Sequence, residues 1–164
     1  MTRLPRRPDI KLKFRQKDKL FELFCLLVLL AYWLLVILNY KVLPDTVPIH
    51  YNNSGEIDGY GAKNKIWNLP ISATILYLVM TAFAFIPQYF NYLEEVTEDN
   101  AERLYRKGAH NFRFLKLLII VCFLSITLFS MFANDLRPYP IHNLVIAALP
   151  YIMLVPTFYY LFKN

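Results

Sequence analysis

An unbroken apolar run near the start of the chain limits the fold more than any other feature of the sequence. Residues 20–40 contain fourteen Leu, Ile, Val or Phe side chains and a single charged residue, Glu22. As an α-helix rising about 1.5 Å per residue, this run would be about 31 Å long, which matches the hydrocarbon core of a bilayer. We therefore expect a first membrane span, with Glu22 in its first turn at headgroup depth, where its charge stays in contact with water.

Three further apolar stretches predict three more spans, at about 66–90, 114–133 and 141–162. The composition agrees, because a chain of 164 residues that is 57% hydrophobic is too apolar for a soluble domain. No aspartate, glutamate, lysine, arginine or histidine falls in the middle of a predicted span, which argues against an ion-coupled transporter. The predicted fold class is an all-α membrane protein, a four-transmembrane-helix bundle over 20–162 that follows a basic cytoplasmic tail at 1–19.

Basic residues are distributed unevenly between the two sets of connections. Fourteen lie in the tail at 1–19, in the segment 91–116 and at the C-terminal end, whereas four lie in the loop 41–65 and the turn 134–140. The positive-inside rule then places both termini in the cytoplasm and the loop 41–65 outside. We expect a multi-pass protein of the bacterial cytoplasmic membrane, with its tail on anionic lipid. No motif favours nucleic acid as a partner.

The predicted cytoplasmic connector, 91–113, is acidic in its first half and basic in its second. This order suits a helix dipole, and Thr97, Asp99 or Asn100 could cap a short helix that ends near Asn111. The apolar side of such a helix is modest. We therefore expect a solvated connector that rests on the membrane surface.

The outer loop, 41–65, contains three of the four glycines of the chain within seven residues. Glycine gathers where the backbone needs a positive φ or approaches another group closely. Apolar and polar residues alternate over 47–51, and Asn52–Gly55 is a strong turn signal, so the loop predicts a short hairpin at the outer end of the bundle. The candidate ligand-binding or loop-structuring residues are His50, Asn52, Gly55, Glu56, Asp58 and Gly61.

The chemistry of this loop is open to more than one interpretation. His50, Glu56 and Asp58 are residue types that bind zinc, but their spacing matches no known metal pattern, so we expect His50 to bond to loop backbone. We predict no metal, cofactor or catalytic residue. The favoured function is non-enzymatic recognition of a peptide, an envelope protein or lipid. The alternatives are a metal-dependent membrane enzyme and a structural subunit or assembly factor of a membrane complex.

The outer loop also carries a family resemblance. Its sequences PIHYN (48–52) and GEIDGYG (55–61) resemble the outer loop of the SdpI-like family of small bacterial membrane proteins, a domain of unknown function with a P-x-H-aromatic-N…G-E-x-D-x-aromatic-G pattern. The resemblance is specific over 43–70. It implies a role in immunity to a secreted peptide toxin, or in relaying the presence of that toxin to a repressor held at the membrane.

Overall fold

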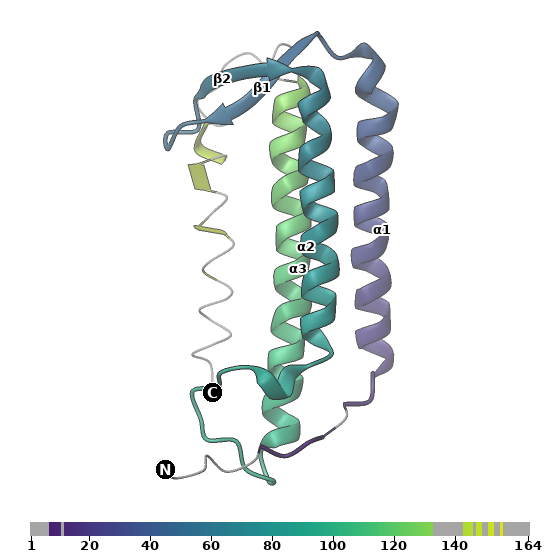
Figure 1. Ribbon diagram of the computed structural model, residues 1–164, viewed down its shortest axis with the longest axis vertical. Coiled ribbons are helices and arrows are strands. Elements are labelled where there is room, and N and C mark those ends of the chain that lie inside the picture. Colours follow the sequence, from purple (N-terminus) through teal and green to yellow (C-terminus); the bar gives the residue numbers. More distant parts are fainter. Residues whose placement is uncertain are drawn as a thin grey trace.

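Three long helices make up more than half of the part of the chain that the structure describes (Figure 1). The computed structural model describes residues 7–10, 12–132, 143–145, 147–148, 151–152 and 155. Helices α1 (Gln16–Asn39) and α3 (Ala101–Phe132) run in one direction, and α2 (Asn68–Ala84) runs in the other. Each lies in a segment long and apolar enough to cross a membrane, so the chain is a membrane-embedded protein. Most of the predicted fourth span, 141–162, lies outside the described residues.

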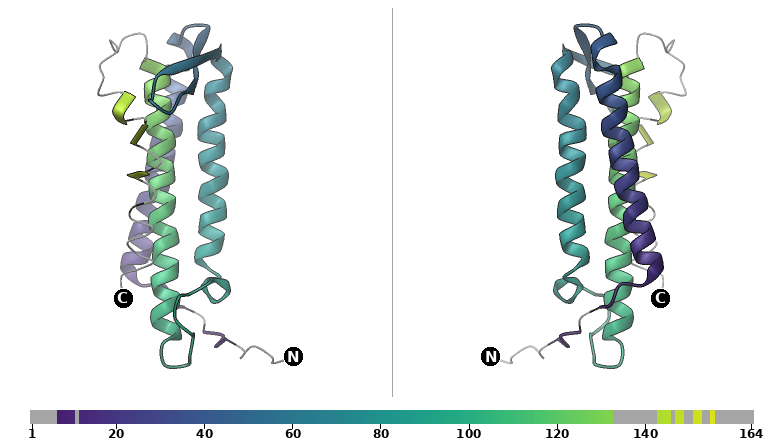
Figure 2. Two further views of the ribbon diagram at one scale, coloured as in Figure 1. Left: turned by 90° about the vertical axis from the view of Figure 1, so that its left-hand side faces the viewer. Right: turned by 90° about the vertical axis from the view of Figure 1, so that its right-hand side faces the viewer.

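A two-stranded antiparallel sheet covers one end of this bundle, as predicted (Figure 2). Strand β1 (Thr46–Tyr51) pairs with β2 (Ile57–Ala62), and short 3₁₀ turns, η1 (Tyr40–Val42) and η2 (Lys63–Trp67), join the hairpin to α1 and α2. We call this the hairpin end. The opposite end, where α1 begins and α2 ends, is called the tail end.

Hydrogen bonds between side chains join the three helices in the part of the core that is mainly apolar. The hydroxyl groups of Tyr32 on α1 and Thr127 on α3 lie 2.5 Å apart in a buried contact. The indole N–H of Trp33 donates to Thr74 Oγ1 on α2 at 2.9 Å. Nearer the hairpin, the ring of Trp67 stacks on Trp33, which gives this end an aromatic layer of the kind found at membrane interfaces. Polar contacts of this type help to fix how membrane helices pack.

Helix α3 is longer than the sequence predicted. The expected short helix ending near Asn111 and the span beginning at 114 are one continuous helix, Ala101–Phe132. The segment contains no proline, so nothing interrupts its backbone hydrogen bonds. Asn100 directly precedes the helix, and its carbonyl accepts the first intrahelical bond, from the N–H of Leu104.

The connector at the tail end is also less solvated than predicted. Leu104 and Tyr105 are buried and pack with Ile10 and Leu12 of the N-terminal segment in a small second core. The Tyr105 hydroxyl donates to the carbonyl oxygen of Pro8 at 2.9 Å. The described part of the N-terminal segment therefore lies against α3 instead of forming a free tail.

Helix α2 ends inside the predicted span 66–90, shortly before a proline, which cannot continue the backbone hydrogen bonds of a helix. The helix ends at Ala84, and Pro87 opens a 3₁₀ turn, η3 (Pro87–Tyr89). The guanidinium of Arg7 donates to the carbonyl oxygens of Gln88 and Phe90, one of them in this turn. The N-terminal segment, the end of α2 and the start of α3 thus meet at the tail end.

Candidate functional site

The turn of the hairpin is built by the side chain of Asn52. Its Oδ1 accepts hydrogen bonds from the backbone N–H groups of Ser54 and Glu56, at 2.9 and 3.0 Å. Its Nδ2 donates to Glu56 Oε2 at 2.9 Å. Asparagine and a following glycine commonly form such turns because the side chain replaces a backbone partner. Asn52 and Glu56 therefore structure the loop.

Gly55 and Gly61 are required for different reasons. Gly55 has φ of 78°, which disfavours any residue with a Cβ, and a Cβ there would lie 2.0 Å from the carbonyl oxygen of Asn143. A Cβ on Gly61 would meet the end of the flexible Ile49 side chain at 2.8 Å. Gly55 is thus fixed by backbone conformation and close approach, and Gly61 only by side-chain packing.

The hairpin is anchored to the bundle on one face. Val47 is fully buried, and the hydroxyl groups of Tyr51 and Ser130 on α3 lie 3.0 Å apart. Burial raises the pKa of Tyr51 above its ordinary value, and the hydrogen bond to Ser130 opposes this in part. Asp45 and Lys63 form an ion pair of 3.1 Å at the base of the hairpin. These contacts hold the strands in one position on α3.

The other face carries a pair of ionisable residues, His50 and Asp58. Their Nδ1 and Oδ1 atoms lie 2.5 Å apart, and the side chains are 70% and 43% exposed. The expected backbone partner for His50 is therefore replaced by a carboxylate. His50 lies opposite Gly59 in the ladder, with a register shift on each side of this pair, so Ile49 and Asp58 have no ladder partner. The pairs on either side of these shifts share one register, in which His50 and Asp58 would be opposite each other, and the carboxylate does lie beside the imidazole.

Glu56 is the third residue of the metal hypothesis, and its side chain bonds to a residue outside this pair. Its carboxylate accepts from Asn52. Within the described ranges, no three His, Cys, Asp or Glu side chains are grouped closely enough to hold a metal ion. The exposed pair can form hydrogen bonds and ionic contacts with a ligand, and two further side chains of the same hairpin, Ile49 and Tyr60, are also exposed.

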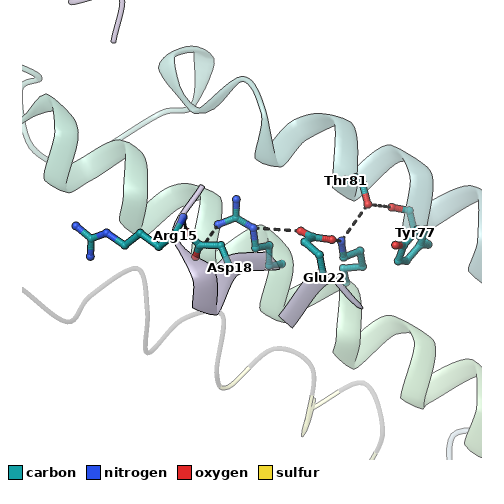
Figure 3. A network of polar contacts seen from close by, with 7 residues as sticks. Arg15, Asp18, Glu22, Tyr77 and Thr81 are labelled. Atoms are coloured by element: carbon teal, nitrogen blue, oxygen red, sulfur yellow. Dashed lines mark hydrogen bonds and ion pairs between the residues drawn. The ribbon is translucent and has the colours of Figure 1, made fainter. Parts of the chain in front are cut away.

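A second polar constellation at the tail end was missed by the sequence analysis. Glu22 on α1 accepts from Arg113 Nε at 3.1 Å and from the ammonium of Lys116, both on α3. Lys116 also donates to Thr81 on α2 at 3.0 Å, and Arg113 contacts Asp18 at 3.5 Å. Figure 3 shows Asp18, Glu22 and Thr81 along one line of contacts that joins the three helices.

This network corrects the expectation for Glu22. The Lys116 side chain is fully buried and Glu22 is 22% exposed, so the carboxylate relies on two cations more than on water. Glu22 lies in the second turn of α1, which begins at Gln16. A signal was present in the sequence: Asp18 and Glu22 are four residues apart, and Arg113 and Lys116 are three apart, so each pair lies on one helix face.

Comparisons with known proteins find similarity in the region of the hairpin. The family model described as "Domain of unknown function (DUF1648)" matches residues 27–74, which include part of α1, the whole hairpin and the first turns of α2. An uncharacterized protein of Archaeoglobus fulgidus is 34% identical over 74 residues, 40% of this chain and 40% of that protein. The chain thus spans about two fifths of the length of that relative. No solved structure matches.

Proposed function

We propose that this chain is a non-enzymatic recognition protein of the bacterial cytoplasmic membrane, with its hairpin facing outward. The observation that carries the proposal is the exposed His50–Asp58 pair on a hairpin that is fixed to the bundle. A rigid support lowers the entropy cost of binding, because the contact groups are already in position. We also propose a fourth span over 141–162, with both termini in the cytoplasm, in line with the uneven distribution of basic residues.

A peptide is the ligand that this surface suits best. The hairpin that carries the charged pair also exposes Tyr60, which is 61% exposed, and Ile49, which is 43% exposed. A surface that combines an aromatic ring, an aliphatic side chain and an ion pair offers contacts for both the backbone and the side chains of a peptide. The resemblance to the SdpI-like family supports one form of this proposal, in which the peptide is a secreted toxin and the chain protects its producer.

The continuous helix α3 supports a relay of such binding across the membrane. At the hairpin end of α3, Ser130 contacts Tyr51 of the hairpin. The other end of α3 carries Arg113 and the buried core around Tyr105. A ligand that moves the hairpin would therefore act on one end of a single rigid element that reaches the other side.

The orientation is tested by cysteine labelling on intact cells. Ser54, at the hairpin turn, and Thr97, near the start of α3, are both exposed, and each is replaced by cysteine in a background without Cys25 and Cys122. An impermeant thiol reagent is expected to label position 54 and not position 97. Labelling of position 97 alone would place the hairpin in the cytoplasm and contradict the proposal.

Recognition is tested by photo-crosslinking and by a toxin challenge. A photoreactive residue at Tyr60 is expected to capture a peptide from the outside of the cell, whereas the same residue at Leu78, in the apolar part of α2, is expected to capture none. Expression in a toxin-sensitive strain is expected to protect it, and His50→Ala or Asp58→Ala to reduce that protection. Equal sensitivity of all strains, with no crosslink specific to Tyr60, would exclude this function.

A further inference from the structure

The tail end contains a cavity that the proposed function does not use. Its volume is about 710 Å³, within the range of roughly 300 to 1,000 Å³ that small-molecule sites usually occupy. Three separate segments form it: the N-terminal segment with the first turn of α1, the end of α2 with η3, and the part of α3 from Arg106 to Arg113. The cavity therefore lies at the level where the three candidate membrane spans reach the membrane surface.

The lining of this cavity is strongly basic. Six lysine or arginine residues line it, against the two acids Asp9 and Asp18. The six are Lys13, Arg15, Lys17, Arg106, Lys107 and Arg113. A concave site with this excess of one charge concentrates ions of the opposite sign.

Much of this positive charge is not neutralised by carboxylates within the described part of the chain. Arg113 is paired with Asp18 and Glu22, and Arg106 with Glu102. No carboxylate partner is seen there for Arg15 or Lys17, and Figure 3 shows the Arg15 guanidinium pointing away from the network that holds Asp18. Arg15 and Lys17 thus lie at the start of α1, where backbone N–H groups also favour the binding of an anion.

An apolar wall accompanies these cations. Phe14, Phe21 and Phe85 line the cavity, and the rings of Phe14 and Phe85 lie 5.1 Å apart. A free inorganic anion gains nothing from such a wall, whereas a lipid places a charged headgroup directly beside apolar chains. A basic cavity with an apolar wall, at the level of the membrane surface, therefore suits a lipid better than a soluble anion.

We infer that this cavity binds a phosphate-bearing anion, namely the headgroup of an anionic phospholipid. Arg15 and Lys17 contact the phosphate, and the phenylalanine rings contact the beginning of the acyl chains. This site is separate from the hairpin, so a negative result for lipid binding would not contradict the proposed recognition function, nor the reverse.

The test uses the full chain in nanodiscs of phosphatidylcholine that contain a small fraction of phosphatidylglycerol. Native mass spectrometry after release into detergent counts the lipids retained. The unaltered chain is expected to retain phosphatidylglycerol in preference to phosphatidylcholine. Lys17→Gln and Arg15→Gln are each expected to weaken this retention about tenfold, the effect of losing one charge-assisted hydrogen bond.

Lys19→Gln is the matched control, because Lys19 is an exposed lysine two residues from Lys17 that does not line the cavity. It is expected to leave retention unchanged. Equal losses for Lys17→Gln and Lys19→Gln would show diffuse attraction to the basic segment and would overturn the proposal, as would no loss for Lys17→Gln.

Two further experiments test whether the bound phosphate belongs to a lipid or to a soluble anion, and whether it binds inside the cavity. Inorganic phosphate added at millimolar concentration is expected to leave the lipid bound, and displacement of the lipid by phosphate alone would assign the site to a soluble anion instead. Ala84→Leu fills part of the cavity without changing any charge, since Ala84 lines it. This variant, checked for folding by thermal melting, is expected to lose the lipid, and full retention would contradict binding inside the cavity.

Discussion

The His50–Asp58 pair at the hairpin end and the Glu22 network at the tail end hold their charges in opposite ways. At the hairpin end, His50 and Asp58, eight residues apart in the sequence, pair on an exposed surface. At the tail end, Glu22 pairs with Arg113 and Lys116, which are 91 and 94 residues away, and Lys116 is fully buried. Exposed ions keep their hydration and add little stability, whereas buried ions depend on each other. The exposed pair is thus available to a ligand, and the buried network serves the packing of the helices.

The largest effect is expected from breaking the buried network. Glu22→Gln leaves the charge of Lys116 buried without its carboxylate, which costs about 3 to 5 kcal/mol in comparable pairs. Unfolding in mixed micelles, followed by circular dichroism, measures the loss. Glu98→Gln, at an exposed acid near the same end, is the control and is expected to change stability by less than about 0.5 kcal/mol.

The double variant Glu22→Met with Lys116→Met sharpens this prediction. It removes both charges and leaves Arg113 with Asp18, so most of the lost stability is expected to return. A single Glu22→Gln variant as stable as the unaltered protein would show that the network contributes nothing to folding, and the contrast between the two ends would then disappear.

The next largest effect is expected at the hairpin turn. Gly55→Ala places a Cβ at a φ of 78° and against the backbone of Asn143, at a cost of about 2 kcal/mol or more. Gly61→Ala is the matched comparison, because there the Cβ meets only side-chain atoms, those of Ile49 and Lys65. Hydrogen exchange over 46–62 is expected to rise clearly in the first variant and slightly in the second. Equal effects would mean that Gly55 is not needed for its backbone conformation.

The same contrast explains what the sequence could predict. The hairpin follows from neighbours in the chain: alternation over 47–51, the Asn52 side chain that closes the turn, and Gly55 at a positive φ. Such local signals are visible without any knowledge of tertiary structure. The end of α2 before Pro87 is a local effect of the same kind.

The tail end could not be predicted in this way because its contacts join distant parts of the chain. Arg113 and Lys116 resemble ordinary cytoplasmic charges in the sequence, but in the structure α3 packs against α1, where Glu22 offsets part of the cost of burying them. Tyr105 likewise looks like a surface residue until the N-terminal segment covers it. The pairing of His50 with Asp58 was missed for a smaller reason: the sequence predicted a hairpin but not the register of its two strands.

A smaller effect is expected from the anchor between the hairpin and α3. Tyr51→Phe removes the hydrogen bond to Ser130 and should cost about 0.5 to 1.5 kcal/mol. Because the pKa of Tyr51 is raised in the folded protein, its stabilising effect is complete below the ordinary tyrosine pKa of about 10 and is lost as pH rises through the folded value. Hydrogen exchange in β1 should therefore increase at alkaline pH.

The Tyr51→Phe variant provides the control for this pH dependence, since it has no phenol to ionise at that position. Its β1 strand is expected to be less protected at neutral pH and to lose less additional protection above about pH 10. The same alkaline loss in both proteins would assign the effect to other groups.

The smallest effect on stability is expected from the exposed pair itself. Asp58→Asn removes an ion pair between side chains that are largely in water, so unfolding should change by no more than about 0.5 kcal/mol. Asp45→Asn, which breaks the other exposed pair of the hairpin, should be similar. The two variants are expected to differ in ligand capture from Tyr60, which Asp58→Asn reduces and Asp45→Asn preserves. If Asp58→Asn instead destabilised the chain as strongly as Glu22→Gln, the pair would be a structural element of the hairpin, and its proposed use in recognition would lose its basis.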